Sequence, residues 1–316
     1  MNIPGEKKMK IGIIGAGNVG ATTAHIALMK NLGDIYLLDI EPDMAKGKAI
    51  DLNQSKYLFG ADVSVEGGDD YERIKASDII VITAGLARKP GMSRDDLLVK
   101  NFEIIKSISL KIKDSPKEPV VIVVSNPLDL MAYTAYRVTG FPRSRVLGMA
   151  GILDTYRFYH FIQSKTGAKS KAISSMILGS HGDTMVPLIS HTKINRLDIS
   201  SVIPAEDIKI LSDRARNGGA EIVSLLKTGS AYYAPAASTV RMMEAIVKDE
   251  NALLPCSVYA DGFYGLDDLF IGLPVKLSKK GADAVVDIKL THEEGRALYD
   301  SAAAIKEQIT KIKGML

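Results

Sequence analysis

The sequence predicts an α/β protein in which a doubly wound parallel sheet precedes an α+β half. Short apolar runs alternate with longer amphipathic segments through the first 150 residues, and the order of elements then changes. Two runs, 79–83 and 120–125, are continuously apolar, which is typical of parallel strands covered on both faces. A chain of 316 residues is also long for a single core. We therefore expect two domains, 1–150 and 151–316.

Each element of the first half follows from its local pattern. Runs rich in Ile, Val and Leu predict strands over 9–14, 34–39, 63–65, 79–83 and 120–125. Longer segments with helical spacing of apolar residues predict helices over 18–30, 44–57 and 94–113. Ser93 and Asp96 have the spacing of a capping box at the start of the last of these helices.

The second half has a different rhythm, in which helices surround shorter strand-like pieces. Helical patterns cover 154–166, 206–227, 234–248 and the amphipathic tail 291–312. A strand-like piece covers 174–178, and the runs 254–259 and 269–275 flank a glycine-rich turn at 261–265. Two runs joined by such a turn predict antiparallel strands.

Composition and charge exclude several classes of protein. The formal net charge is only +3, and basic residues are interleaved with acidic ones, which argues against nucleic acid or an anionic membrane as the main partner. No apolar run approaches the roughly 20 residues of a membrane span, and no secretory signal is evident. The single cysteine, Cys256, permits no internal disulfide and makes a cysteine-rich metal site implausible. We expect a cytoplasmic protein without a metal, and a buried strand position for Cys256.

A glycine motif marks a site for a dinucleotide. The pattern G-x-G-x-x-G follows the first predicted strand and opens the first helix, as Gly15-Ala16-Gly17-Asn18-Val19-Gly20. Gly15 permits a tight turn, Gly17 lets a pyrophosphate approach the backbone, and Gly20 allows close packing of helix on sheet. The helix N-terminus adds free N–H groups and partial positive charge. Alone, the motif is also compatible with a plain glycine turn.

Asp39 strengthens the dinucleotide interpretation. It ends the second predicted strand, 24 residues after Gly15, close to the roughly 20-residue offset of the acid that holds an adenosine ribose. A carboxylate there accepts hydrogen bonds from both ribose hydroxyls and repels a 2′-phosphate, which favours NAD over NADP. Without the glycine motif, Asp39 would read as an ordinary strand-end acid.

The catalytic candidate is one of five histidines. His181 lies in a turn after a strand-like run, with Gly179 and Gly182 on either side, so its ring can face a cleft. Oxidation of an alcohol by hydride transfer needs a group that takes the hydroxyl proton near neutral pH, and imidazole suits that role. Asp154 is a candidate partner for the ring, or else a helix N-cap. Arg157, three residues on, shares its helical face, unless it is a surface arginine.

Two loops lie at the edge where ligands of such sheets bind. The loop 85–96 follows a predicted strand and carries the cations Arg88, Lys89 and Arg94, whose guanidinium groups match carboxylates in two-point contacts. Its Pro-Gly pair suits a segment that folds over a ligand, although a basic surface loop has the same composition. Asn126 ends another strand at this edge, where it binds a substrate oxygen or shapes a turn.

These motifs, in this order, resemble the lactate/malate dehydrogenase family, and the likeness covers nearly the whole chain. It is carried by the glycine motif, Asp39, Thr83-Ala84-Gly85, the Arg94 loop, Ser125-Asn126-Pro127, Leu153-Asp154-Thr155-Tyr156-Arg157 and Gly179-Ser180-His181-Gly182-Asp183. The resemblance implies a Rossmann-type NAD-binding domain over 1–150 and an α+β substrate domain over 151–316. It also implies a homotetramer or homodimer.

The resemblance assigns a role to each catalytic candidate. His181 is similar to the family's acid–base histidine, and Asp154 to the carboxylate that orients it. Arg157 is similar to the arginine that grips the substrate's C1 carboxylate. Arg94 resembles the mobile-loop arginine that polarises the carbonyl, and Asn126 the asparagine that assists it.

The resemblance also implies the residues that contact NAD and one feature of the backbone. The expected NAD contacts are Gly15, Gly17, Asn18, Val19, Gly20, Asp39, Thr83, Ala84, Gly85, Asn101 and Asn126. In this family the bond that precedes the matching proline is cis, so we expect a cis bond between Asn126 and Pro127.

Substrate choice depends on Arg88. Lactate enzymes of this family usually have glutamine at the matching position, whereas the Arg88 form resembles malate enzymes that bind a second carboxylate. An arginine left without its partner in a closed pocket costs roughly 2–5 kcal/mol, which disfavours pyruvate. Ala231 aligns with a threonine typical of lactate enzymes and leaves room for the larger acid. We therefore expect a small dicarboxylate, malate or oxaloacetate, and closest likeness to the lactate-dehydrogenase-like malate enzymes.

Other functions are also compatible with some of these residues. Lactate dehydrogenase, or a broader 2-hydroxy-acid dehydrogenase, is the alternative within the family. A non-catalytic NAD-binding sensor would keep the glycine motif and Asp39 but would need neither His181 nor Arg157. An NAD-using, metal-dependent glycosidase would need metal ligands, which the isolated Cys256 does not supply.

Overall fold

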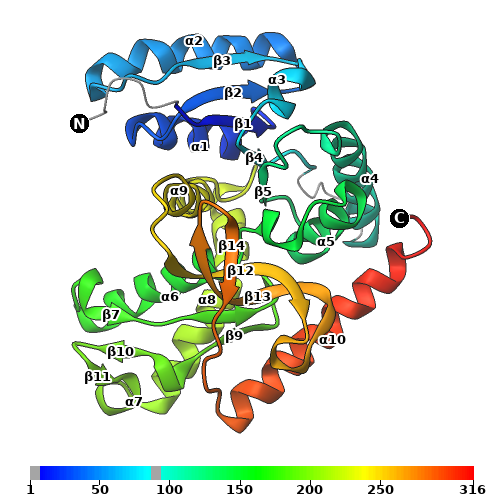
Figure 1. Ribbon diagram of the computed structural model, residues 1–316. Helices are drawn as coiled ribbons and strands as arrows, with labels where there is room; N and C mark the ends of the chain where they lie inside the picture. The colour runs from blue at the N-terminus through cyan, green and yellow to red at the C-terminus, as the bar shows by residue number, and fades with distance from the viewer. Residues whose placement is uncertain (1–7, 87–93) are drawn as a thin grey trace.

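One mixed sheet runs through both halves of the chain in the computed structural model, which describes residues 8–86 and 94–316. Figure 1 shows strands β1 to β5 in the part built by the first half and β12 to β14 in the part built by the second. Among the described residues the sheet has eleven strands in the order β3-β2-β1-β4-β5-β6-β12-β13-β8-β9, with β14 paired to β13. A separate small sheet has the order β11-β10-β7. The α/β prediction, with a doubly wound parallel sheet and an α+β half, is confirmed.

The parallel part of the sheet is built by the first half of the chain. Its strands are β1 (Lys10–Ile14), β2 (Asp34–Leu38), β3 (Val65–Gly68), β4 (Ile79–Ile82), β5 (Val120–Val123) and β6 (Val146–Gly148). The helices between them are α1 (Asn18–Met29), α2 (Pro42–Phe59), α3 (Tyr71–Lys75), α4 (Arg94–Ile112) and α5 (Leu128–Thr139). β1 pairs with both β2 and β4, so the strand order reverses there. Ligands of such sheets bind at that reversal, beyond the carboxyl ends of the strands.

The strands and helices predicted for this half agree with the structure apart from the third strand, and α3, α5 and β6 were not predicted. The third strand is Val65–Gly68, beyond the predicted 63–65, because two glycines conceal its pattern. A Cβ at Gly67 would overlap the carbonyl of Ala45 on α2, so this strand position requires glycine. Helix α5 follows Asn126 and Pro127 and was not predicted, and the expected capping box begins at Ser93, outside the described residues.

The second half adds helices around the antiparallel end of the sheet. The helices are α6 (Gly151–Thr166), α7 (Ile199–Val202), α8 (Ala205–Leu226), α9 (Tyr233–Val247) and α10 (His292–Ile312). The long strands are β12 (Ala252–Asp261), β13 (Asp267–Ser278) and β14 (Gly281–Val285), and the short ones are β7 (Ile173–Ser174), β8 (Ile177–Gly179), β9 (Met185–Pro187), β10 (Lys193–Ile194) and β11 (Leu197–Asp198). Single 3-10 turns occupy Arg143–Arg145, Ser170–Ala172, Ile189–His191 and Phe263–Gly265.

Most predictions for this half are also confirmed. β12 and β13 are antiparallel, and α10 begins after Thr291, which forms a capping box with Glu294. The expected piece 174–178 is divided between β7 and β8, which belong to different sheets. The break is at Ser175, whose backbone N–H donates to the Tyr159 hydroxyl at 2.9 Å instead of to a strand.

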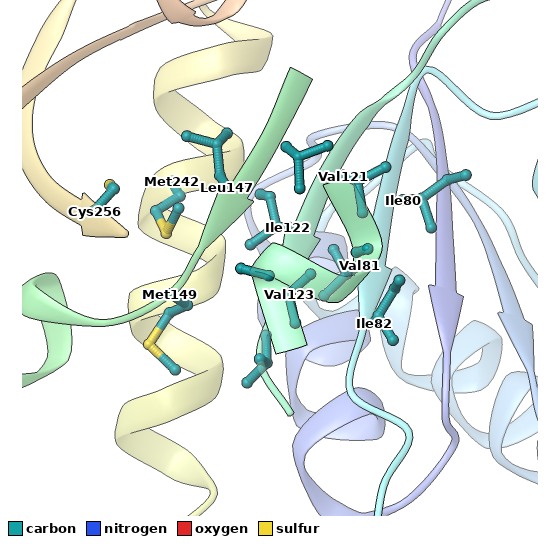
Figure 2. Close-up of a cluster of buried hydrophobic side chains, with 14 of the residues drawn as sticks. Ile80, Val81, Ile82, Val121, Ile122, Val123, Leu147, Met149, Met242 and Cys256 are labelled. Carbon is teal, nitrogen blue, oxygen red and sulfur yellow. The ribbon is translucent and has the colours of Figure 1, made fainter. Parts of the chain in front are cut away.

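A continuous apolar core joins the two halves. β6 pairs with β12 through Gly148 and Ser257. Figure 2 shows side chains of β4, β5 and β6 together with Met242 of α9 and Cys256 of β12 in one buried cluster. Cys256 is fully buried in a strand, as expected, and burial raises the pKa of its thiol. The proposed division near residue 150 falls between β6 and α6, and two domains remain a prediction.

No helix in the described ranges is long and apolar enough to cross a membrane.

Candidate active site

The glycine-rich turn lies between β1 and α1, at the point where strand order reverses. Gly15 has a φ of +107°, which side chains rarely adopt. A Cβ on Gly20 would overlap the Gly15 carbonyl, so glycine here lets α1 approach the turn, whereas a Cβ on Gly17 would meet nothing within 4 Å. The N-cap of α1 is Gly17, which offers no side-chain cap. The first turn of α1 therefore presents backbone N–H groups beside an open approach, as a pyrophosphate requires.

Asp39 follows β2 directly and contacts this turn. Its Oδ2 accepts the Ala16 N–H at 2.6 Å and its Oδ1 accepts the Glu41 N–H at 3.1 Å. The ammonium of Lys48 on α2 donates to the Ala16 carbonyl at 2.6 Å. A carboxylate offers about four lone-pair positions, so Asp39 keeps acceptor capacity for two hydroxyls after these bonds. The residues present fit an adenosine ribose and pyrophosphate.

The segment after β4 completes the edge of this site. The N–H groups of Thr83 and Ala84 donate to the Ile14 carbonyl at 2.9 and 3.0 Å, and the Thr83 hydroxyl donates to Gly15 at 3.0 Å. Gly85 follows beside Asn101. These contacts hold the end of β4 against the glycine-rich turn.

Asn101 on α4 connects two loops of the site. Its side-chain oxygen accepts the Leu86 N–H at 2.7 Å, and its amide donates to the carbonyls of Leu86 at 3.2 Å and Asn126 at 2.7 Å. The residue is 1% exposed. The side-chain amide of Asn101 is therefore already hydrogen-bonded to backbone groups. Direct contact between Asn101 and a cofactor stays a prediction.

His181 and Asp154 form a pair across the second half of the chain. Nδ1 of His181, in the turn after β8, lies 2.9 Å from Oδ2 of Asp154 on α6. The side chains of His181 and Asp154 are 15% and 3% exposed. The N-cap alternative for Asp154 is wrong, because α6 begins at Gly151 with Ala150 as its N-cap, and Asp154 lies one turn inside. An acceptor at Nδ1 fixes the ring's tautomer and orients Nε2 for proton exchange.

The Asp154 carboxylate also affects the pKa values of its two neighbours, His181 and Arg157. Burial acts to lower the pKa of His181, but the attraction of Asp154 and the hydrogen bond that its carboxylate accepts outweigh burial, so this pKa lies above its ordinary value. Burial lowers the pKa of Arg157, and the contact with Asp154 opposes the shift. Nη1 of Arg157 lies 3.4 Å from Oδ1 of Asp154. One buried carboxylate therefore supports both a proton-accepting histidine and a cationic arginine.

These side chains open onto a cavity of about 220 Å³. Its lining includes Val19, Asn126, Arg157, His181, Gly219 and Ala231. The Nε of Arg157 is buried and, among the described residues, has no hydrogen-bond partner. The guanidinium group of Arg157 lines the cavity, and a cation there suits an anionic ligand. Val19 of the glycine motif lines the same cavity, so the predicted cofactor and catalytic ends meet there.

Other predicted features of this region have different outcomes. The Asn126–Pro127 peptide bond is cis, as expected. Arg88 lies outside the described residues. Arg94 is the first residue of α4, but its side chain is not among those that the structure describes. The roles of the loop cations therefore stay predictions.

Sequence reasoning missed two sets of residues around the site. Asp129 and Ser257 lie behind His181, and no local pattern marks them. Gly218 and Gly219, on α8, lie against Arg157: a Cβ would stand 3.5 Å from its Cδ and 3.7 Å from its Nη2, respectively, at ordinary contact distances. Two adjacent glycines inside a helical pattern are unfavourable by roughly 1 kcal/mol each, and that cost was the available signal.

Comparison with known proteins agrees with this geometry. Residues 9–148 match the profile of the lactate/malate dehydrogenase NAD binding domain, and residues 152–315 match that of the family's alpha/beta C-terminal domain. A malate dehydrogenase of Rhodopirellula baltica is 46% identical over 312 residues, covering 98% of this chain and 99% of the relative. A malate dehydrogenase of Chloroherpeton thalassium is 47% identical over 309 residues, covering 98% of this chain and 100% of the relative.

Solved structures give the same result. The malate dehydrogenase of Cryptosporidium parvum superimposes with a TM-score of 0.94 at 39% identity, covering 98% of this chain and 100% of that one. The lactate dehydrogenase of Cryptosporidium parvum, complexed with lactic acid and nicotinamide adenine dinucleotide, has a TM-score of 0.94 at 34% identity, covering 98% and 99%. This chain belongs to the lactate/malate dehydrogenase family.

Proposed function

We propose that this chain is an NAD-dependent dehydrogenase that interconverts (S)-malate and oxaloacetate. The observation that carries the proposal is the shared Asp154 carboxylate, which holds His181 and Arg157 beside one cavity. A proton acceptor and a carboxylate-binding cation are what oxidation of a 2-hydroxy acid requires. The malate dehydrogenases that are 46–47% identical over almost the whole chain support the choice of substrate.

His181 is the acid–base residue in this proposal. Neutral His181 takes the malate hydroxyl proton at Nε2, and the reverse reaction returns it to the carbonyl oxygen. Asp154 accepts the hydrogen bond from Nδ1 and stabilises the imidazolium that forms, which agrees with the raised pKa of His181. Bound NAD supplies the hydride acceptor.

Arg157, which lines the cavity, binds the C1 carboxylate through two of its N–H groups. Asn126 donates to the substrate's C2 oxygen, and Arg94 closes over it and stabilises the negative charge that develops there. One preorganised donor of this kind is commonly worth about 3–4 kcal/mol of transition-state stabilisation.

The cofactor residues are those at the reversal of strand order. The turn from Gly15 to Gly20, with Asn18 and Val19 at the start of α1, holds the pyrophosphate, and Thr83, Ala84 and Gly85 border the nicotinamide end. Asp39 holds the adenosine ribose and disfavours NADP. Asn101 shapes this edge through Leu86 and Asn126.

Arg88 selects the dicarboxylate by pairing with its far carboxylate when the loop is closed. Ala231, which lines the cavity, leaves space for that larger acid. A lactate or broader 2-hydroxy-acid dehydrogenase is the alternative, since a lactate dehydrogenase is among the similar structures.

One assay tests the assignment. NADH oxidation is followed with oxaloacetate and with pyruvate, and we expect kcat/KM to favour oxaloacetate. Arg88→Gln should move this ratio toward pyruvate, and His181→Ala should abolish turnover while NADH still binds. A wild-type preference for pyruvate would contradict the malate assignment, and an active His181→Ala enzyme would contradict the assignment of the base.

Two further expectations concern the protein in the cell. We infer a homotetramer or homodimer, supported by apolar side chains that α2 leaves exposed, namely Ile50, Tyr57, Leu58 and Phe59. Sedimentation equilibrium tests this, since a concentration-independent monomer would contradict it. A cytoplasmic location stays a prediction.

A further inference from the structure

A second buried carboxylate, Asp129, lies behind the catalytic pair. It occupies the first turn of α5, three residues after Asn126, and is 5% exposed. Nothing in the proposed reaction uses it, although a buried acid is costly unless it is hydrogen-bonded and compensated. Its position therefore needs a physical explanation.

Asp129 is bonded to two elements of the other half of the chain. Its Oδ2 accepts the backbone N–H of His181 at 2.9 Å, and its Oδ1 accepts the hydroxyl of Ser257 on β12 at 2.7 Å. Ser257 is fully buried and pairs with Gly148 of β6. Both carboxylate oxygens are thus fixed by groups that are themselves held in place.

His181 is therefore held by carboxylates at two points. Asp154 of α6 binds its ring, and Asp129 of α5 binds its backbone. Because α5 begins just after Asn126, the contact with Asp129 fixes the distance between the histidine turn and the part of the site built on the parallel sheet. The contact with Asp154 lies within the second half and fixes only the direction of the ring.

We propose that Asp129 is a positioning residue, which docks the His181 turn onto the cofactor half of the molecule and whose negative charge favours protonated His181. The inference rests on the proposed function of His181 as the acid–base group.

The surroundings of Asp129 support the electrostatic part of this proposal. Burial raises the pKa of Asp129 to about 6, and the like charge of Asp154 acts in the same direction. The hydrogen bonds from Ser257 and the His181 N–H, and the attraction of His181, act to lower it. Ionised Asp129 in turn acts to raise the pKa of His181. Protonation of His181 is therefore favoured by the charges of Asp154 and Asp129 and opposed by the charge of Arg157.

Two substitutions separate geometry from charge. Asp129→Asn keeps an oxygen for the His181 N–H, and its amide donates to the Ser257 oxygen once that hydroxyl turns, so the shape survives without the charge. Asp129→Ala removes both anchors. A displacement of about 1 Å in a reacting group costs on the order of 100-fold, so we expect Asp129→Ala to lose about that factor in kcat while the Kd of NADH changes less than about twofold.

The effect of the Asp129 charge is measured from the pH dependence of the two reaction directions. Without ionised Asp129, His181 should titrate at lower pH. Malate oxidation needs neutral His181, so its acid limb should move to lower pH in Asp129→Asn. Oxaloacetate reduction needs protonated His181, so its alkaline limb should also move to lower pH. NMR titration of the labelled histidine rings measures the same shift without turnover, and the His181→Ala spectrum assigns the signal.

Glu294→Gln is the matched control. Glu294 is also buried, at 8% exposure, and accepts a backbone N–H at 3.0 Å and a serine hydroxyl at 2.7 Å, both from Ser190. The substitution neutralises a similarly bonded carboxylate on α10 that does not line the cavity. The pH limbs and the titration of His181 should stay as in the wild type.

The proposal is overturned if His181 titrates at the same pH in Asp129→Asn and in the wild type, if Glu294→Gln causes the same shift, or if Asp129→Ala retains wild-type kcat. If Asp129→Ala does not fold, the NMR titration of His181 in Asp129→Asn tests the proposal instead. If the malate assignment is wrong, the wild type will not reduce oxaloacetate. The NMR titration of His181 does not depend on turnover, so it still tests the role of Asp129.

Discussion

The carboxylate of Asp154 contacts two basic side chains at once. One oxygen binds the His181 ring at 2.9 Å, and the other lies 3.4 Å from Arg157. A buried anion that is 3% exposed interacts strongly with both, because little water screens it. Proton transfer and substrate binding are therefore linked through a single side chain, and a change in its charge should affect both.

We predict that Asp154→Asn lowers kcat by at least about 100-fold, the smaller end of the contribution of a positioned acid–base group. Asp154 raises the pKa of His181, so its neutralisation should lower that pKa and move the acid limb of malate oxidation to lower pH. The KM of oxaloacetate should also rise, because Arg157 loses its partner. Steady-state kinetics from pH 5 to 9 measure both effects, and an unmoved limb would contradict the role given to Asp154.

Protein stability provides a second readout of the same change. Because the pKa of His181 is higher in the fold than in the unfolded chain, its protonated form stabilises the fold fully below the ordinary pKa of about 6.5. This contribution is lost as the pH rises through the raised pKa. In Asp154→Asn that loss of stability above pH 6.5 should be smaller, as urea unfolding at several pH values would show.

At the scale of elements, two helices build the substrate pocket together. α6 carries Asp154 and Arg157 one turn apart on one face. α8 brings Gly218 and Gly219 against the Arg157 side chain, where any larger residue would extend toward the guanidinium or the cavity. These glycines weaken α8, and Gly219 keeps side-chain atoms out of the cavity beside Arg157.

We predict that Gly219→Ala raises stability and impairs substrate binding. The methyl group fits at 3.7 Å from Arg157 and improves helix propensity by about 1 kcal/mol, so Tm should rise by about 2 °C. Because Gly219 lines the cavity, the KM of oxaloacetate should rise about 10-fold, the usual effect of one misplaced methyl group.

Gly47→Ala on α2 is the control for this prediction. A Cβ there meets nothing within 4 Å, so it should bring a similar gain in Tm with no change in KM. If both variants had the same KM as the wild type, the two glycines of α8 would have no part in shaping the pocket.

For the whole molecule, the continuity of the core decides how it unfolds. The side chains in Figure 2 come from β4, β5 and β6 and from α9 and β12, on both sides of the proposed domain boundary. The backbone pairing of Gly148 with Ser257 and the bonds of Asp129 cross it as well. Neither half can lose its structure without exposing apolar surface of the other.

We predict a single cooperative unfolding transition. NADH at 100 times its Kd should shift that whole transition, adding about 2.7 kcal/mol to the free energy of unfolding. Calorimetry with and without NADH measures this. Two separate transitions, of which only one responds to NADH, would show that the halves are energetically independent.

Much of the fold was predictable because its signals are local. The apolar strands, the helices between them and the glycine motif each depend on a few neighbouring residues, and their repetition implies the parallel sheet. β3 and the 174–178 segment were misjudged where tertiary contacts, with Ala45 and with Tyr159, override the local pattern.

The sequence by itself therefore determined the fold class, the glycine-rich turn, and the residue types of the site. The tertiary structure alone decided which groups meet. His181 is 27 residues from Asp154 and 52 from Asp129, and Asp129 is 128 from Ser257, so no local pattern links them. Hydrogen bonds act over about 3 Å, and only the packing of α5, α6 and β12 brings these groups within that distance.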